Sequence, residues 1–331
     1  YTKELVRVGS PTLVRVQDEA FFYYLTDCKN AKNMMKDHKG FNSNFIKRWF
    51  FKDSKNCNME GLFEGAVSED TEAKGLPWVG AKPTSLKAFY RNTENNLPKL
   101  DNLNTSKAIS IAHMFEGSKY GTGNTAGSNL NSWDLQRCES MAYCFYNASF
   151  TGGIRDWFRK TSGDGKTFFD GVDAEGMFEG TCAYNGQSLL WGHFKPISTK
   201  RMFRQNKIFN KKIEGWDMTS CTDISSMFRD SIYNSDTISD WLLPLVKNAK
   251  HCFDGSNFTG EIRNWFSEAT LQGTDFVIED ISGMFQGSDH DGSGLKKWAK
   301  RMNHSVKAAI GLARNASNMK CEQLSEWFQQ D

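Results

Sequence analysis

Apolar and polar positions recur along this chain at a regular interval, and the pattern is clearest at residues 202–228. The unit reads, in order, Met202-Phe203, Phe209-Asn210, Ile213 and Trp216-Asp217, and a step rich in serine and threonine leads to Met227-Phe228, 25 residues after Met202. Self-similarity at a period of roughly 20–50 residues is the sequence signature of repeat architectures. The repeat therefore decides the fold prediction.

Aligning the chain on this Met-Phe pair gives eleven units, in nine of which the second residue of the pair is Phe; the first residues of the units are Met34, Leu62, Ala88, Met114, Cys144, Met177, Met202, Met227, Cys252, Met284 and Leu312. All ten tryptophans follow an opening by 13 to 19 residues, one to a unit: Trp49, Trp78, Trp133, Trp157, Trp191, Trp216, Trp241, Trp265, Trp298 and Trp327. Only the third unit lacks one. Periodic apolar positions face inward, so we expect these indoles, together with Phe203 and Phe228, to form a structural ladder.

Within a unit, the residues before the opening have helical spacing. Ile224, Met227 and Phe228 lie at i, i+3 and i+4, which places three apolar side chains on one helix face. A glycine or asparagine follows most openings by three residues and would end the helix. The segment from Phe209 to Trp216 is short and rich in β-branched and aromatic residues, which favours a strand. The predicted fold class is α/β: a right-handed, leucine-rich-repeat-like solenoid of about eleven repeats, each with a short strand and a short helix.

The two ends differ from the repeat. Residues 1–27 read as two short strands, 5–8 and 13–16, followed by an aromatic run, and we interpret them as an N-terminal cap. The repeat would then span 28–331, with a more helical C-terminal end at about 294–331. That end is either a second cap or one more unit of a longer chain.

Composition narrows the partners. Forty-one basic residues against 39 acidic ones give a net charge of +2, which provides no general field for nucleic acid. No apolar run approaches the ~20 residues that span a bilayer. Of the eight cysteines, Cys28 and Cys57 occupy nearly equivalent places in adjacent units. Neighbouring strands lie ~4.8 Å apart, so this pair is the candidate disulfide.

No coherent catalytic, cofactor or metal site is predicted. Gly121-x-Gly123 is one residue off a dinucleotide fingerprint, and Lys160 stands where a phosphate loop needs glycine. The six histidines lack metal-ligand spacing, and Asp289-x-Asp291 lacks the later glutamate of a calcium loop, so a polar turn is favoured there. Glu64, Glu116 and Glu179 precede glycines and are interpreted as helix-end surface residues.

These motifs resemble the BspA-like class of leucine-rich repeats, a bacterial surface protein repeat. Residues 202–228 match its Met-Phe, Phe-Asn and Ile-x-x-Trp-Asp pattern, and Trp133-Asp134 matches as well. The resemblance spans about residues 28–327, is strongest in the middle and is loose at 62–135. Most units lack aspartate after tryptophan, and insertions break the even step. It implies a right-handed array used for adhesion or as a structural module on microbial surface or secreted proteins, without catalytic residues.

The leading functional prediction is a non-enzymatic, extracellular or cell-surface repeat protein that mediates adhesion or assembly in a filament or coat. A fainter repeat of 108 residues, seen at 46–50, 154–158 and 262–266, favours assembly. The alternative is an intracellular scaffold or receptor-like module. A protein or glycan would bind the solenoid face or the insertion loops at 118–130, 158–172 and 266–278. Candidate glycosylation sites are Asn104, Asn147, Asn257, Asn303 and Asn315.

Overall fold

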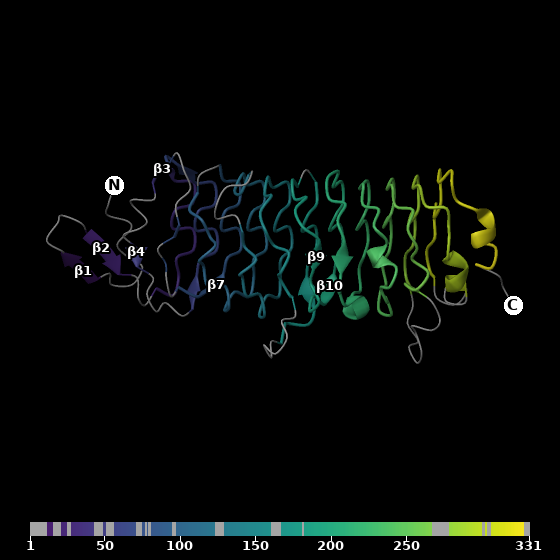
Figure 1. Cartoon of the computed structure of the whole chain (residues 1–331), viewed down its shortest axis with the longest axis horizontal. Coiled ribbons are helices and arrows are strands. Elements are labelled where there is room, and N and C mark those ends of the chain that lie inside the picture. Colours follow the sequence, from purple (N-terminus) through teal and green to yellow (C-terminus); the bar gives the residue numbers. More distant parts are fainter. Residues whose placement is uncertain are drawn as a thin grey trace.

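The computed structural model describes residues 12–15, 21–24, 28–42, 49–50, 56–70, 75–76, 78, 81–94, 97–122, 129–159, 167–180, 182–266, 278–299, 302 and 306–327. They form an elongated body in which the chain advances from the N-terminal to the C-terminal end in successive turns, here called rungs (Figure 1). Long-range contacts therefore join each rung mainly to the next one, as in other repeat proteins.

The regular elements are short. The strands are β1 (Thr12–Arg15), β2 (Phe21–Tyr24), β3 (Lys39–Phe41), β4 (Trp49–Phe50), β5 (Cys57–Asn58), β6 (Val67–Ser68), β7 (Pro83–Ser85), β8 (Val172–Asp173), β9 (Leu189–Leu190), β10 (Pro196–Ser198) and β11 (Ile213–Glu214), and the 3-10 turns are η2 (Met218–Ser220), η3 (Asp236–Ile238), η5 (Leu295–Trp298) and η6 (Cys321–Gln323). β1 and β2 pair antiparallel, whereas β2–β4, β3–β6, β5–β7, β8–β10 and β9–β11 pair in parallel. Most of the described chain is irregular.

One column of parallel pairing runs through the rungs. Its members are mostly small and polar: Asn30, Asn58, Ser85, Ser110, Ser140, Asp173, Ser198, Asp223, Asn248, Asp280 and Ala308. Except for Ala308, their side chains accept a hydrogen bond from the N–H two residues later; Asp223 Oδ1, for example, lies 2.7 Å from the nitrogen of Ser225. Short polar side chains favour such local turns over helix. Each polar residue therefore starts a short stretch of tight turns, here called a turn segment, such as the one that runs from Asp223 to Arg229.

Hydrogen bonds alternate within each turn segment. The N–H groups of Ile224, Ser226 and Phe228 donate to carbonyls of the next rung, whereas those of Met227 and Arg229 donate to carbonyls three residues back. The central position of a turn segment is the one held by Phe203 or Phe228 in the best-matching units. The residues two before and two after this position have left-handed backbone conformations. In chain order they are Asn33, Asp37, Gly61, Gly65, Ala88, Asn92, His113, Gly117, Tyr143, Asn147, Gly176, Gly180, Arg201, Gln205, Ser226, Asp230, His251, Gly255, Gly283, Gly287, Gly311 and Asn315. The segment is thus a series of tight turns.

The predicted α/β solenoid is therefore wrong. No helix of seven or more residues occurs in the part of the chain that the structure describes, which has short paired parallel strands and mostly irregular backbone. Ile224, Met227 and Phe228 do turn inward together, but a left-handed residue between them, Ser226 with φ of 56°, is incompatible with a right-handed helix. Successive turns satisfy the same apolar spacing.

Three columns of stacked aromatic rings fill the interior. The central column joins Phe115, Phe145, Phe178, Phe203, Phe228, Phe253 and Phe285, with ring centroids 5.2 to 5.8 Å apart and planes within 12°. A second joins Tyr120, Phe150, Tyr184, Phe209 and Tyr233, and Phe258 stacks on His290 beyond it. The third is formed by the tryptophans from Trp133 to Trp265, at 5.4 to 6.1 Å. Burial of these rings is the main source of stability.

Register and ends differ from the prediction in detail. Phe63 donates its N–H to the carbonyl of Phe89 and so pairs with Tyr90. The central residue of the third unit is therefore Tyr90, one residue later than the predicted opening at Ala88 implies.

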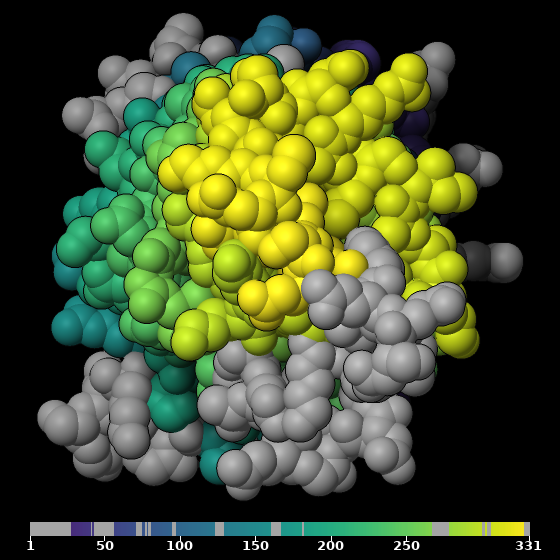
Figure 2. Space-filling view, turned by 90° about the vertical axis from the view of Figure 1, so that its right-hand side faces the viewer, coloured from purple at the N-terminus to yellow at the C-terminus, as the bar shows by residue number. Residues whose placement is uncertain are grey.

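At the N-terminal end, Thr12–Arg15 pairs with Phe21–Tyr24, while the other predicted strand, 5–8, lies outside the described residues. The last rungs cover the C-terminal end (Figure 2).

Candidate functional site

The turn segments present one regular outward surface. In each rung it consists of the left-handed residue two before the central ring and the residue directly after that ring. We call this surface the turn face; the members used below are His113, Glu116, Tyr143, Tyr146, Glu179, Arg201, Arg204, Arg229, His251 and Asp254. Most are half-buried. Because ladder hydrogen bonds fix the backbone beneath them, their positions repeat from rung to rung.

Aromatic and acidic side chains alternate at one part of the turn face. The ring of His113 stacks on Tyr143 with centroids 5.3 Å apart, and His113 Nδ1 lies 2.6 Å from Glu116 Oε2. Tyr143 donates its hydroxyl to Glu175 Oε1 at 2.6 Å and packs edge-on against Tyr146. Partial burial and this bond to Glu175 raise the pKa of Tyr143. The phenol therefore stays a hydrogen-bond donor at neutral pH.

Arginines occupy the turn face further along the chain, beginning in the rung after that of Glu179. Arg201 and Arg204 both donate to Glu179 Oε1, at 2.7 and 2.9 Å. Arg229 Nε and His251 Nδ1 lie 3.2 and 3.0 Å from Asp254 Oδ2, both without good hydrogen-bond geometry, and the arginine contact is an ion pair. Burial opposes the charge of Arg201, but Glu179 outweighs it and raises the pKa of Arg201. The guanidinium groups are thus held by acids while their outer edges stay partly exposed.

For two acids of this face, Glu64 and Glu179, the sequence prediction is wrong. Glu64 and Glu179 are buried, with 8% and 1% of their surface exposed, rather than being helix-end surface residues. Each is held by arginine, Glu64 by Arg91 and Glu179 by Arg201 and Arg204. The signal available was arginine at a repeated offset from the opening, in Arg204 and Arg229. Carboxylate buried beside arginine fixes the arginine's orientation.

The predicted ladder residues lie in the interior. Trp133, Trp157, Trp191, Trp216, Trp241, Trp265 and Trp298 are at most 6% exposed, and Phe203 stacks on Phe228 at 5.6 Å with parallel planes. Trp49 is in β4, and its side chain lies outside the described part of the structure. Trp133, Trp157, Trp191, Trp265, Trp298 and Trp327 each donate the indole N–H to a carbonyl of the preceding rung. None of these indoles is available as a surface stacking platform.

The candidate disulfide is not formed. Cys28 and Cys57 are both free and buried, with their sulfur atoms 3.4 Å apart and the Cys57 thiol donating to Cys28. The bond from Cys57 lowers the pKa of Cys28 to about 7 and raises the pKa of Cys57. Adjacency follows from the equivalent places of the two residues in neighbouring rungs. Residue spacing alone could not distinguish a thiol pair from a bridge.

The other predicted sites are scattered. Asn104, Asn147, Asn257 and Asn315 are exposed, and Asn303 is outside the described residues. Much of the predicted binding loops is also outside the described residues, namely 123–128, 160–166 and 267–277.

Asp291 is held by Lys320 and Ser293 in a polar turn. Over the described ranges, no three His, Cys, Asp or Glu side chains converge as metal ligands would, and no helix there is long and apolar enough to cross a membrane.

Comparison with known proteins corrects the family assignment. The sequence model of the family described as "Mycoplasma protein of unknown function, DUF285" matches residues 77–175 and 172–298, well over half of the chain. Comparison with curated proteins gives no match, nor does comparison with solved structures. The predicted membership of the BspA-like leucine-rich repeats is therefore wrong: the family model that matches is a different one. The chain belongs to the DUF285 family.

Proposed function

We propose that this chain is a non-enzymatic repeat protein of the cell surface or extracellular space, which mediates adhesion or structural assembly through protein contacts made by the turn face. The observation that carries the proposal is the recurrence of half-buried tyrosine, histidine and arginine at equivalent positions of most rungs between residues 113 and 254. Tyrosine and arginine are the residue types enriched at the energetic centres of protein interfaces.

The rigidity of this surface supports the same proposal. Arg201 and Arg204 are already fixed by Glu179, and Tyr143 by Glu175 and His113. A partner would not have to immobilise these side chains, so less conformational entropy is lost on binding. A stack of rungs also presents an extended surface, which suits a large protein partner better than a small molecule.

A second candidate is an intracellular scaffold. The observation that favours it is eight free cysteines, including the adjacent Cys28 and Cys57, because thiols persist in reducing compartments. Mass spectrometry of protein isolated from its native cells distinguishes the two: reduced thiols and unoccupied sequons favour the scaffold.

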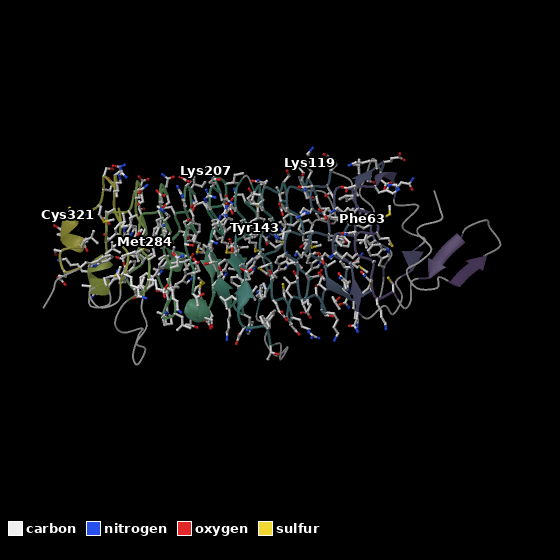
Figure 3. The ribbon with its side chains drawn as sticks, turned by 180° about the vertical axis from the view of Figure 1, so that it is seen from behind. Phe63, Lys119, Tyr143, Lys207, Met284 and Cys321 are labelled. Atoms are coloured by element: carbon white, nitrogen blue, oxygen red, sulfur yellow. The ribbon has the colours of Figure 1, made fainter. Side chains whose placement is uncertain are left out.

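The proposal is tested with Tyr146→Ala combined with Arg204→Ala, and with Lys207→Gln as a matched control. Lys207 is exposed and lies on the outer edge of the body (Figure 3). Two measurements are made: sedimentation velocity over a range of concentrations, and retention of protein-coated beads on layers of microbial or animal cells. We expect self-association or retention, lost in the double variant but kept in the control. Absence of both with the unaltered protein, or equal loss in the control, would refute the proposal, as would turnover abolished by one loop mutation.

A further inference from the structure

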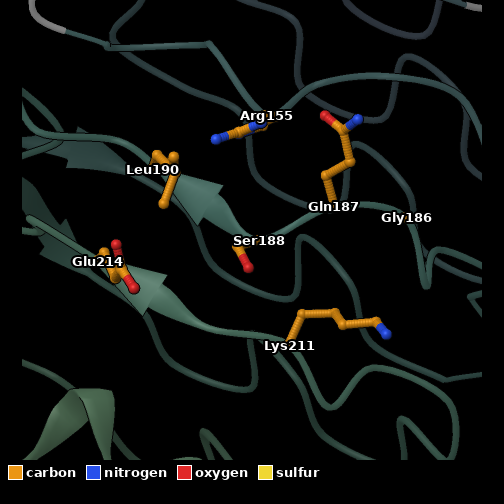
Figure 4. Close-up of a pocket in the computed structure, with 7 residues that line it drawn as sticks. All are labelled: Arg155, Gly186, Gln187, Ser188, Leu190, Lys211 and Glu214. Carbon is orange, nitrogen blue, oxygen red and sulfur yellow. The ribbon is translucent and has the colours of Figure 1, made fainter.

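An open pocket of about 440 Å³ lies beside β9 and β11, on residues separate from the turn face (Figure 4). It is lined by Arg155, Gly186, Gln187, Ser188, Leu190, Lys211 and Glu214. These residues come from the three consecutive rungs that carry Trp157, Trp191 and Trp216. The volume is within the range of roughly 300–1,000 Å³ found for ligand sites. The pocket is thus large enough for a side chain or a short segment of a partner.

Two cations in this pocket are uncompensated. Arg155 and Lys211 form no ion pair with any residue that the structure describes. The Nε of Arg155 is also buried and has no hydrogen-bond partner among those residues. Buried polar groups in native proteins are nearly always bonded, so an orphaned donor indicates a ligand or water at that place. Arg155 lies on one side of Ser188 and Lys211 on the other (Figure 4).

The lining selects among anions. A guanidinium fork matches the two oxygens of a carboxylate or a phosphate, and Gln187 and Ser188 add neutral donors. Glu214 contributes one negative charge, and its partner Lys212, 3.6 Å away, is outside the lining. A polyanion would be repelled by the Glu214 carboxylate, whereas a ligand with a single carboxylate could bind to the cations at a distance from Glu214. No aromatic ring lines the pocket to stack on a sugar.

We propose that this pocket binds a single carboxylate of a partner protein, with Arg155 and Lys211 as its cationic ligands and Gln187 and Ser188 as neutral donors. Leu190 supplies apolar contact for the stem of an acidic side chain. Glu214 excludes polyanions such as nucleic acid and sulfated glycans. The proposal does not depend on the turn face being a binding surface.

The test follows the Nε–Hε resonance of Arg155 by NMR on labelled full-length protein, assigned from its absence in Arg155→Lys. The probes are Ac-Gly-Glu-Gly-NH2, its neutral twin Ac-Gly-Gln-Gly-NH2, and Ac-Gly-Gly-Gly-OH, which carries only a terminal carboxylate. Inorganic phosphate and glucuronate are tested as competing anions. Lys207→Gln is the control for the loss of one exposed lysine, because Lys207 is at the long edge opposite β9 (Figures 1 and 3).

We expect a saturable shift with the glutamate peptide and none with its glutamine twin; comparison with the terminal carboxylate shows which source is preferred. Lys211→Gln should weaken binding roughly fivefold, as the loss of one exposed charge pair does, and Glu214→Gln should strengthen it. Lys207→Gln should leave the affinity unchanged. Equal shifts with both peptides, equal effects of the two lysine variants, or tighter binding of phosphate or glucuronate than of either carboxylate peptide would overturn the proposal.

Discussion

The indole Nε1 of Trp191 lies 3.0 Å from the carbonyl oxygen of Ile154 in the preceding rung, to which it donates a hydrogen bond. Its ring also stacks on Trp216 of the following rung, with centroids 5.4 Å apart. One side chain therefore links three rungs: it contacts the preceding rung through this hydrogen bond and through stacking on Trp157, and the following rung through stacking on Trp216. This arrangement accounts for the regular spacing of tryptophan without any ligand.

The two tryptophans differ in a way that can be measured. Trp216 Nε1 has no hydrogen-bond partner in the described part of the chain. Trp191→Phe leaves the Ile154 carbonyl without its donor, whereas Trp216→Phe breaks no such bond. We expect Trp191→Phe to lower the free energy of unfolding by about 1 kcal/mol more than Trp216→Phe, and Trp191→Ala or Trp216→Ala to cost about 3–5 kcal/mol. Urea unfolding measures both; equal losses for the two phenylalanine variants would contradict the role of the bond.

Glycine is required more strictly in some rungs than in others. A Cβ at Gly180, with φ of 79°, would lie 2.1 Å from Asn147 Oδ1, whereas one at Gly287, with φ of 58°, would have open space. Gly287→Ala should cost only the left-handed conformation, about 1–2 kcal/mol. Gly180→Ala should cost about 0.5–1.5 kcal/mol more, because the exposed Asn147 side chain must change its rotamer to relieve the clash, and Asn147→Gly should recover most of that excess. Thermal unfolding of the three variants is the measurement, and identical losses at both glycines would disprove the clash.

Stability should depend on pH through His290, which replaces a phenylalanine or tyrosine in the second aromatic column. Its Nε2 donates to the Gly260 carbonyl at 3.1 Å, and its Nδ1 accepts from the Gly292 N–H at 2.9 Å. Burial lowers the pKa of His290 below its ordinary 6.5, although Asp291 opposes the shift. The unfolded chain therefore binds the proton more readily, and stability falls as pH drops below 6.5, by up to about 1.4 kcal/mol per unit.

His290→Phe keeps a ring against Phe258 and Phe285 and removes the titrating group. Urea unfolding between pH 5 and 7 should show a smaller pH dependence in this variant than in the unaltered protein. An unchanged slope would show that other groups are responsible.

Thiol reactivity should be confined to one position. Cys321 is exposed, and the other seven cysteines are buried. Burial raises the pKa of Cys138, Cys182 and Cys221 to about 12, so few of these thiols are ionised at neutral pH. Intact-mass measurement after brief maleimide treatment should find one adduct, absent in Cys321→Ser. Rapid modification of several thiols in the native protein would contradict the packing of these columns.

The repeat spacing predicts the aromatic columns but not the conformation of the backbone between them. Equal spacing was enough to align Trp191 with Trp216, because identical units stacked in register place identical residues over one another. It could not separate a helix from successive turns, because Ile224, Met227 and Phe228 face inward in either. The left-handed conformation of Ser226 follows from hydrogen bonds to the next rung and has no signal in the residue type.

The two proposed binding surfaces could not be fully predicted for the same reason, because the sequence does not show the backbone register that places their side chains. Arg155 and Lys211 are far apart in the sequence and meet only through the order and register of three rungs. A shift of one residue, such as the one that makes Tyr90 rather than Phe89 the central residue, would move such side chains to another face. The turn face is easier to predict, because Arg204 and Arg229 recur at a fixed offset, but the same pattern predicts exposed acids where Glu64 and Glu179 are buried.

Quenching of tryptophan fluorescence by iodide tests most directly whether the indoles are structural rather than a ligand-binding surface. Nine tryptophans are at most 6% exposed, and iodide, being charged, does not enter an apolar interior. The native protein should therefore show weak quenching that rises sharply on unfolding in urea. Strong quenching of most of the native fluorescence would contradict the account.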